Sequence, residues 1–107
     1  MKNTITKKMI LECYEAYKSK NKSHCPVGMN ENSAKMMMLW LDSLFSGKSY
    51  HRDGSCLQYE IILQKIKEDF GEPQLQKAKG VLHEHCEWSL KYHNKPMKSH
   101  LKILEKF

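Results

Sequence analysis

The stretch that decides the fold is residues 30–47, which read NENSAKMMMLWLDSLFSG. From Ala34 to Phe45 apolar side chains leave few polar positions on any face, which predicts a helix buried over most of its surface. Asn30 or Asn32 is the expected N-cap, because a side-chain oxygen there accepts from the free amides of the first turn. Gly47 is the expected end, since a residue without Cβ readily adopts the left-handed conformation.

Three consecutive methionines in this helix leave two interpretations open. Met36, Met37 and Met38 point in three directions, so at least one faces away from a core built on residues such as Leu41. One interpretation is a central helix covered by the rest of the chain. The other is an apolar contact for a protein partner, beginning with a second copy in a homodimer, because thioethers suit adaptable surfaces. Its candidate residues are Met36, Met37, Leu39 and Trp40.

Four further segments carry helical patterns on either side of this helix. One runs from about Thr6 to Lys20, and Ser55 with Gln58 forms the capping-box pattern that opens another. Gly71 ends that helix, and Pro73 begins the next, which runs to about Tyr92. A last helix contains the apolar residues Met97, Leu101 and Leu104. The sequence therefore predicts an all-α, single-domain protein over residues 1–107, folded as a compact bundle of about five helices.

The composition and the distribution of apolar residues indicate where in the cell the protein is expected. Hydrophobic residues make up 40% of the 107, enough for one core. The basic N-terminus is not followed by an apolar segment of signal-peptide length, and the longest apolar run, residues 36–41, is far short of the ~20 residues of a membrane span. The four cysteines lie at wide, irregular intervals, which indicates reduced thiols rather than a disulfide framework. We expect a cytoplasmic protein with no membrane partner.

The net charge of +6 at pH 7 raises the question of nucleic acid. All but one of the 18 basic residues are lysine, whereas bidentate recognition of phosphate or guanine favours arginine. If successive helices alternate in direction, one end of the bundle gathers Lys2, Lys7 and Lys8 with two loops, and the opposite end gathers the Cys25 loop with acidic residues. Lysine, histidine and tyrosine side chains from those loops are suited to phosphates and bases. The candidate nucleic-acid residues are Lys48, Tyr50, His51, Arg52, Lys91, Tyr92, His93, Lys95 and Lys98.

The sequence does not fit a helix-turn-helix or a zinc site well. A helix-turn-helix would place its turn at Gly71, but Lys67 and Lys77 then fall where small or apolar residues normally pack. A zinc site is not indicated, because no Cys-x₂-Cys or His-x₃-His pair occurs and only His83 and Cys86 of the densest set share a face. We therefore expect no metal.

Catalysis is not indicated either. The best candidate nucleophile is Cys25, which follows His24 on a loop, but sequence neighbours rarely have the geometry of a working pair. No phosphate-binding glycine loop and no Ser-His-Asp order occurs. The sequence thus favours a protein that is not an enzyme and has no cofactor. We expect it to act through protein association, with the alternative of a basic nucleic-acid-associated factor.

Overall fold

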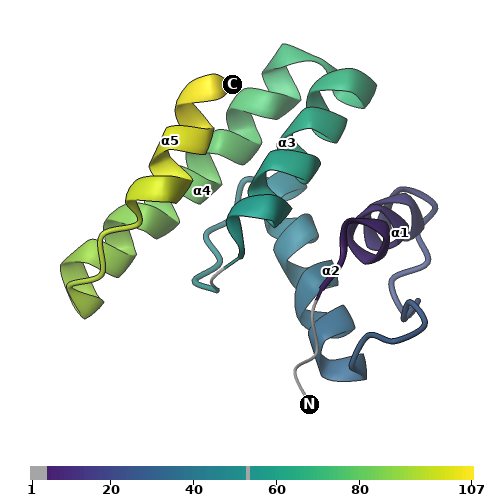
Figure 1. The fold of residues 1–107 in the computed structure, drawn as a ribbon. Coiled ribbons are helices and arrows are strands. Elements are labelled where there is room, and N and C mark those ends of the chain that lie inside the picture. The colour runs from purple at the N-terminus through teal and green to yellow at the C-terminus, as the bar shows by residue number, and fades with distance from the viewer. Residues whose placement is uncertain (1–4, 53) are drawn as a thin grey trace.

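The computed structural model describes residues 5–52 and 54–107 and confirms the all-α prediction. Its described residues form five helices and no strand (Figure 1): α1 (Lys7–Lys18), α2 (Glu31–Ser46), α3 (Cys56–Phe70), α4 (Glu72–His93) and α5 (Lys98–Lys106). The first helix ends at Lys18 rather than Lys20, where the backbone turns to a positive φ of 64°. None of the helices in the described part of the chain combines the length and apolarity needed to cross a bilayer.

The helix ends follow the local rules. The Asn30 side chain accepts from the backbone amides of Asn32 at 2.8 Å and Ser33 at 3.4 Å, and Gly47 closes α2 at a φ of 81°. The Ser55 hydroxyl accepts from the Gln58 amide at 3.1 Å. The reciprocal half of the predicted capping box is replaced by a core contact, because the Gln58 side chain donates to Met37 Sδ at 3.4 Å.

Helices α3, α4 and α5 all contact one another, with α4 antiparallel to α3 and α5 parallel to α3. The tight turn at Gly71 reverses the chain, so α4 runs back beside α3, and α5 then runs back along both (Figure 1). α4 buries Leu75, Ala78 and Leu82 in this packing. The two helices of a helix-turn-helix cross at about 90–120°, whereas α4 runs nearly antiparallel to α3 (Figure 1), so the pair does not have the geometry of that module.

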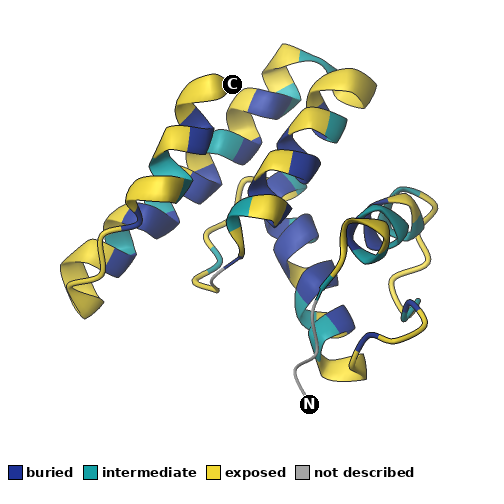
Figure 2. Ribbon diagram, viewed as in Figure 1, coloured by how far each residue is buried: buried dark blue, intermediate teal, exposed yellow. Residues whose placement is uncertain are grey.

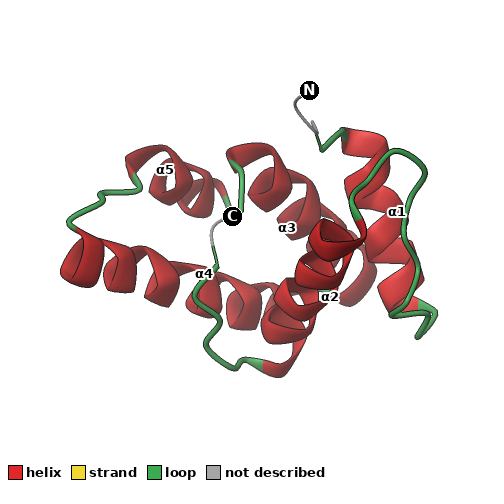
Figure 3. Cartoon of the chain, turned by 90° about the horizontal axis from the view of Figure 1, so that it is seen from below, coloured by secondary structure: helices red, strands yellow, loops and turns green. Residues whose placement is uncertain are grey.

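Helices α1 and α2 do not alternate in direction, contrary to the simple bundle assumed above. Ile5, just before α1, lies with Ser33 of the first turns of α2, whereas Tyr17 near the end of α1 donates to Asp42 in the second half of α2 at 2.9 Å. The connection over residues 19–30 is long enough to return beside α1 (Figure 3). The Cys25 loop consequently lies beside α1, where the Cys25 thiol donates to Met29 O, and does not join an acidic end.

The core lies between the α1–α2 pair and the α3–α5 layer (Figure 2). α2 and α4 each contribute seven buried residues, and the Trp40 ring of α2 stacks on Tyr59 of α3 with centroids 6.0 Å apart. Met37 and Trp40 are each 3% exposed, so their assignment to an exposed protein contact is wrong. Met36 is half-buried and accepts from the Tyr50 hydroxyl at 3.3 Å, which leaves Leu39, 52% exposed, as the open residue of that set. The chain itself covers most of the methionine face.

A polar contact ties α1 to the end of α3. The buried Tyr14 donates its hydroxyl to Asp69 Oδ2 at 2.8 Å, and Lys18 Nζ donates to the same oxygen at 2.8 Å. These two hydrogen bonds, led by that of Lys18, hold the pKa of Asp69 below its ordinary value. Burial, followed by the bond to Asp69, raises the pKa of Tyr14. The contact is formed between a neutral phenol, an ammonium and a carboxylate.

Candidate nucleic-acid interface

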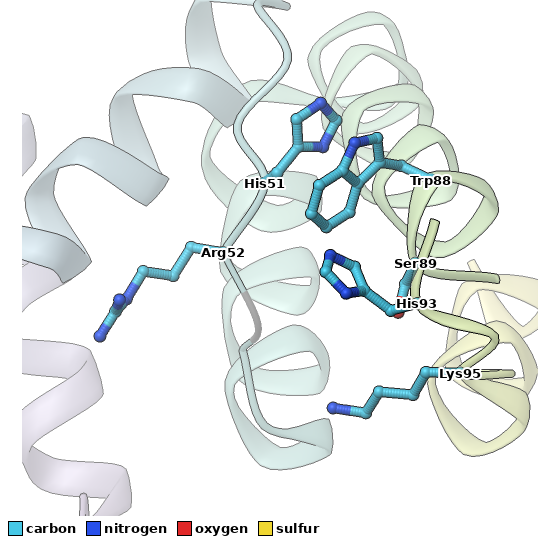
Figure 4. Close-up of a pocket in the computed structure, with 6 residues that line it drawn as sticks. All are labelled: His51, Arg52, Trp88, Ser89, His93 and Lys95. Atoms are coloured by element: carbon cyan, nitrogen blue, oxygen red, sulfur yellow. The ribbon is translucent and has the colours of Figure 1, made fainter. Parts of the chain in front are cut away.

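The α2–α3 connection carries His51 onto α4. The His51 ring stacks on the indole of Trp88 with centroids 4.2 Å apart and planes inclined by 11° (Figure 4). His51 Nε2 also lies 3.9 Å from Glu84 Oε1, one turn earlier on α4. An aromatic pair is thereby built from two segments far apart in the sequence.

A pocket of about 550 Å³ opens beside this pair. Lys95 reaches across from the α4–α5 junction toward the α2–α3 connection, next to His93 (Figure 4). The lining residues are His51, Arg52, Trp88, Ser89, His93 and Lys95. The predicted meeting of the two basic loops is therefore confirmed for His51, Arg52, His93 and Lys95.

Trp88 stands at the centre of an aromatic cluster on the last turns of α4. Its ring lies 4.7 Å from His93 in an edge contact and 5.9 Å from Tyr92. The buried His85 ring lies 5.7 Å away on the inner side. Tyr92 is 63% exposed, with Lys91 Nζ 5.3 Å from its ring centroid. Exposed aromatic surface and ammonium groups thus alternate at this end of the helix.

The side chains of several predicted residues, including that of Arg52, are directed elsewhere. Figure 4 shows the Arg52 side chain directed away from the His51–Trp88 pair, and Arg52 also lines a pocket of about 90 Å³ beside Met36. The Tyr50 hydroxyl points to Met36 on α2. Lys48 and Lys98 are exposed but do not line the larger pocket. Neighbouring residues of the connection direct their side chains to different sides. The order of residues in the sequence does not reveal this.

Lys7 and Lys8, which belong to the described part of the basic N-terminal segment, do not join the pocket. Lys7 lies in a different groove with Glu60, Lys106 and Phe107, between α1 and the end of α5. Lys8 lies along the exposed side of α1 near Glu12. Lys2 falls outside the described residues. The predicted basic end therefore extends over the two loops but not over Lys7 and Lys8.

The cysteine and histidine candidates taken from the sequence are separated. His24 Nε2 lies 3.0 Å from Glu12 Oε2, whereas the Cys25 thiol donates to Met29 O at 3.3 Å. His83 is exposed and pairs with Glu87 at 2.9 Å, while Cys86 is 3% exposed. In residues 5–52 and 54–107 no group of three or more metal-ligating side chains is assembled. None of the four cysteines, all of which lie in the described residues, forms a disulfide.

Sequence reasoning placed too little weight on Trp88. The signal was present, because Trp88 and Tyr92 are four residues apart near the end of a long helix and therefore share a face. The stacking of His51 on that face depends on the path of the connection.

Comparisons with known proteins give no functional information about this site. Searches against protein-family models, curated proteins and solved structures found no match.

Proposed function

We propose that this protein binds single-stranded nucleic acid at the end of α4, through the pocket beside Trp88. The observation that carries the proposal is the stacked His51–Trp88 pair with Lys95 across the pocket. Aromatic rings offer stacking surface to any base, and lysines nearby follow the phosphate backbone. This combination favours single strands, whose bases are open, over a closed duplex.

Aromatic exposure supports the base-stacking part of the proposal. Tyr92 is 63% exposed and Trp88 is half-buried, so neither ring is fully consumed by the core. Base–aromatic stacking is worth about 1–3 kcal/mol per base. The pocket volume of about 550 Å³ is in the range of sites that hold small organic groups.

The type of cation supports backbone binding with little sequence preference. Lys95 lines the pocket, Lys91 and Lys98 are exposed a few positions away along the chain, and the guanidinium of Arg52 is directed away from it. Ammonium groups act as point charges toward phosphate and lack the fork that reads guanine edges. Binding should therefore depend strongly on salt and weakly on sequence.

Fluorescence anisotropy with a labelled single strand of about 12 nucleotides tests the proposal. The slope of log K against log salt should shrink by about 2 when Lys91, Lys95 and Lys98 are all changed to Gln, at about 0.7 per lost phosphate contact. The matched control changes the exposed Lys8, Lys35 and Lys67 to Gln, which removes the same charge elsewhere. Equal slopes for the two triple variants would show that only the net charge of the protein matters and not the position of the lysines. Absence of binding at low salt would contradict the proposal.

Association with another protein is the second candidate. The observation that favours it is an aromatic surface at the far end of α3, where Phe70 is 49% exposed and its ring lies 5.1 Å from Phe45. Phe45 in turn stacks on Tyr17 at 5.2 Å, and Lys18, Lys20 and Lys22 surround the group. The lysines favour an acidic partner over a second copy, because like charges oppose self-association.

Light scattering coupled to size-exclusion chromatography separates the two candidates when absorbance is recorded at protein and nucleic-acid wavelengths. A monomer that carries nucleic acid at low salt and loses it at high salt supports the first. A monomer that carries no nucleic acid at either salt concentration contradicts the first and leaves the acidic protein partner as the candidate. A dimer that persists at high salt and is lost in Phe70→Ser would contradict the acidic partner, because the aromatic surface would then bind a second copy.

A further inference from the structure

Cys56 and His100 form a thiol–imidazole pair that no sequence motif indicated. Cys56 is the first residue of α3 and His100 lies in α5, and their Sγ and Nδ1 atoms are 3.8 Å apart. The other ring nitrogen, Nε2, lies 2.7 Å from the carbonyl oxygen of Gly54. A thiol, a base and a group that orients the base are thus arranged in order, which is the arrangement that activates nucleophilic cysteines.

The Gly54 carbonyl determines which nitrogen of His100 carries the proton. A carbonyl oxygen only accepts, so a hydrogen bond of 2.7 Å requires Nε2 to donate. In the neutral imidazole the remaining nitrogen, Nδ1, then has a free lone pair. That lone pair faces the Cys56 sulfur, so the thiol donates toward a nitrogen able to take its proton.

The orientation of His100 is fixed by the core. Its ring makes an edge contact with Tyr59, with centroids 4.7 Å apart and planes at 73°. Gly54 itself is packed so closely that an added Cβ would lie 3.2 Å from Tyr59 Cε1 and 3.5 Å from Trp40 Cζ2. The carbonyl that orients the imidazole is therefore held by two buried aromatic residues.

The position of Cys56 also suits a negatively charged sulfur. It follows the N-cap Ser55 directly, and the N-terminal end of a helix carries partial positive charge that stabilises anions. The residue is half-buried, unlike the fully enclosed Cys13.

Two of the other cysteines lie in surroundings that oppose reaction. Cys13 is fully buried, and burial, ahead of the charges of Cys25 and Glu12, raises its pKa to about 11. Cys86 is 3% exposed. Cys25 is half-buried like Cys56, but its thiol donates to a backbone carbonyl, which cannot accept a proton in a reaction. Cys25 is therefore the matched internal control.

We propose that Cys56 is a nucleophilic thiol that exchanges with small-molecule disulfides, with His100 as its base. The Cys56 sulfur attacks one sulfur of the disulfide as its proton passes to His100 Nδ1. A new S–S bond forms, the original S–S bond breaks, and the departing thiolate takes the proton from His100. The products are a mixed disulfide on Cys56 and one free small thiol, so atoms and electrons balance without another reagent.

A disulfide is the electrophile that fits the groups present. Exchange requires an accessible thiolate, an approach to sulfur and a proton for the leaving group. Cys56 supplies the thiolate, and its half-buried position leaves part of the residue open to solvent. His100 supplies the proton for the leaving group. The proposal is independent of nucleic-acid binding.

Oxidised glutathione is the probe for the test, used on the intact folded protein. Samples quenched with acid at successive times are digested, and mass spectrometry follows the mixed disulfide at each cysteine separately. Cys56 should react on the order of tenfold faster than Cys25. Equal rates at the two residues, or a faster Cys25, would overturn the proposal without any mutation.

His100→Gln isolates the role of the base. The glutamine amide can still donate to the Gly54 carbonyl from nearly the same place but cannot accept the thiol proton. The Cys56 rate should fall on the order of tenfold while the Cys25 rate stays constant. Wild-type Cys56 should also keep more of its rate between about pH 8 and pH 6 than the variant does, because the imidazole supplies the base at low hydroxide concentration.

Two controls keep the variant informative. Helical circular dichroism should be unchanged, and Cys13 should stay unreactive, because its exposure would report unfolding. If His100→Gln is folded and its Cys56 rate and pH profile match the wild type, His100 is only a packing residue and the proposal is wrong. If the variant unfolds, the wild-type comparison of Cys56 with Cys25 decides.

Discussion

Trp40 and Trp88 are the same residue in two different surroundings. Trp40 is 3% exposed and stacks on Tyr59, which another helix brings to it. Trp88 is half-buried and stacks on His51, which an irregular connection brings to it. The first tryptophan is buried in the core, whereas the second keeps part of its surface exposed. A large apolar residue in a helix therefore indicates a site only when its neighbours leave it partly uncovered.

The largest expected effect is loss of stability in Trp40→Ala. Removing this buried ring should lower the free energy of unfolding by about 3–5 kcal/mol, because a cavity opens beside Tyr59 and Gly54. Trp88→Ala should cost only about 1 kcal/mol, as is typical of partly exposed positions. Urea denaturation followed by circular dichroism measures both. Similar losses for the two variants would remove the distinction between the two tryptophans.

The next effect concerns binding. Trp88→Ala should weaken binding of a single-stranded oligonucleotide by about 1–3 kcal/mol, because it removes a stacking surface. In the wild type, bound bases should also quench Trp88 fluorescence while the buried Trp40 emission remains. Anisotropy and tryptophan emission in the same titration measure the two effects. Unchanged affinity in Trp88→Ala would place the ligand elsewhere.

Tyr14→Phe examines the polar contact on the core side of the molecule. The variant should lose about 1 kcal/mol of stability, since Asp69 and the Lys65 carbonyl lose a hydrogen bond. The lowered pKa of Asp69 stabilises the fold above the ordinary pKa of an aspartate, and this stability is lost as pH falls through the lower folded-state value. Urea midpoints at neutral and acid pH should therefore differ less in Tyr14→Phe than in the wild type.

Tyr17 predicts a loss of stability in alkali. Burial, followed by the hydrogen bond to Asp42, raises its pKa from 10.0 to about 12. The fold favours the protonated phenol, so this contribution is complete below pH 10.0 and is lost as pH rises through about 12. Urea midpoints measured across this range should fall less in Tyr17→Phe than in the wild type. An identical decline would mean that other groups cause it.

The smallest effect is expected for Leu39→Ser. Leu39 is 52% exposed, so its stability should change by no more than about 0.5 kcal/mol. Its molecular mass by light scattering should also match the wild type. A dimer in the wild type that this substitution abolishes would restore the protein contact predicted on α2.

The sequence predicted those features that depend on neighbouring residues. Asn30, Gly47, Ser55 and Gly71 mark helix ends, because capping involves atoms within a few positions. The burial of Met37 and Trp40 required knowledge of which helices cover α2. In the same way, the direction of α1 relative to α2 depends on the path of residues 19–30, which has no local signal.

The candidate sites show the same limit. The two basic loops were expected to meet, but the contact of His51 with Trp88 depends on side-chain directions in the connection. Cys56 and His100 are separated by 44 positions and lie on different helices, so neither belongs to a recognisable motif. His24 and Cys25, which are adjacent, bind different partners. Adjacency in sequence therefore did not produce a thiol–imidazole contact at His24 and Cys25.

The anchored connection between α2 and α3 has a consequence for local unfolding. Tyr50, His51 and Gly54 fasten it to α2, α4 and α5, but the described part of its backbone lacks the repeating hydrogen bonds of a helix. Opening this segment would separate His51 from Trp88 while the helices stay folded. Segments of this kind exchange amide hydrogens at lower free-energy cost than the core. The lifetime of the pocket is therefore set by the detachment of a few residues and not by the global stability of the fold.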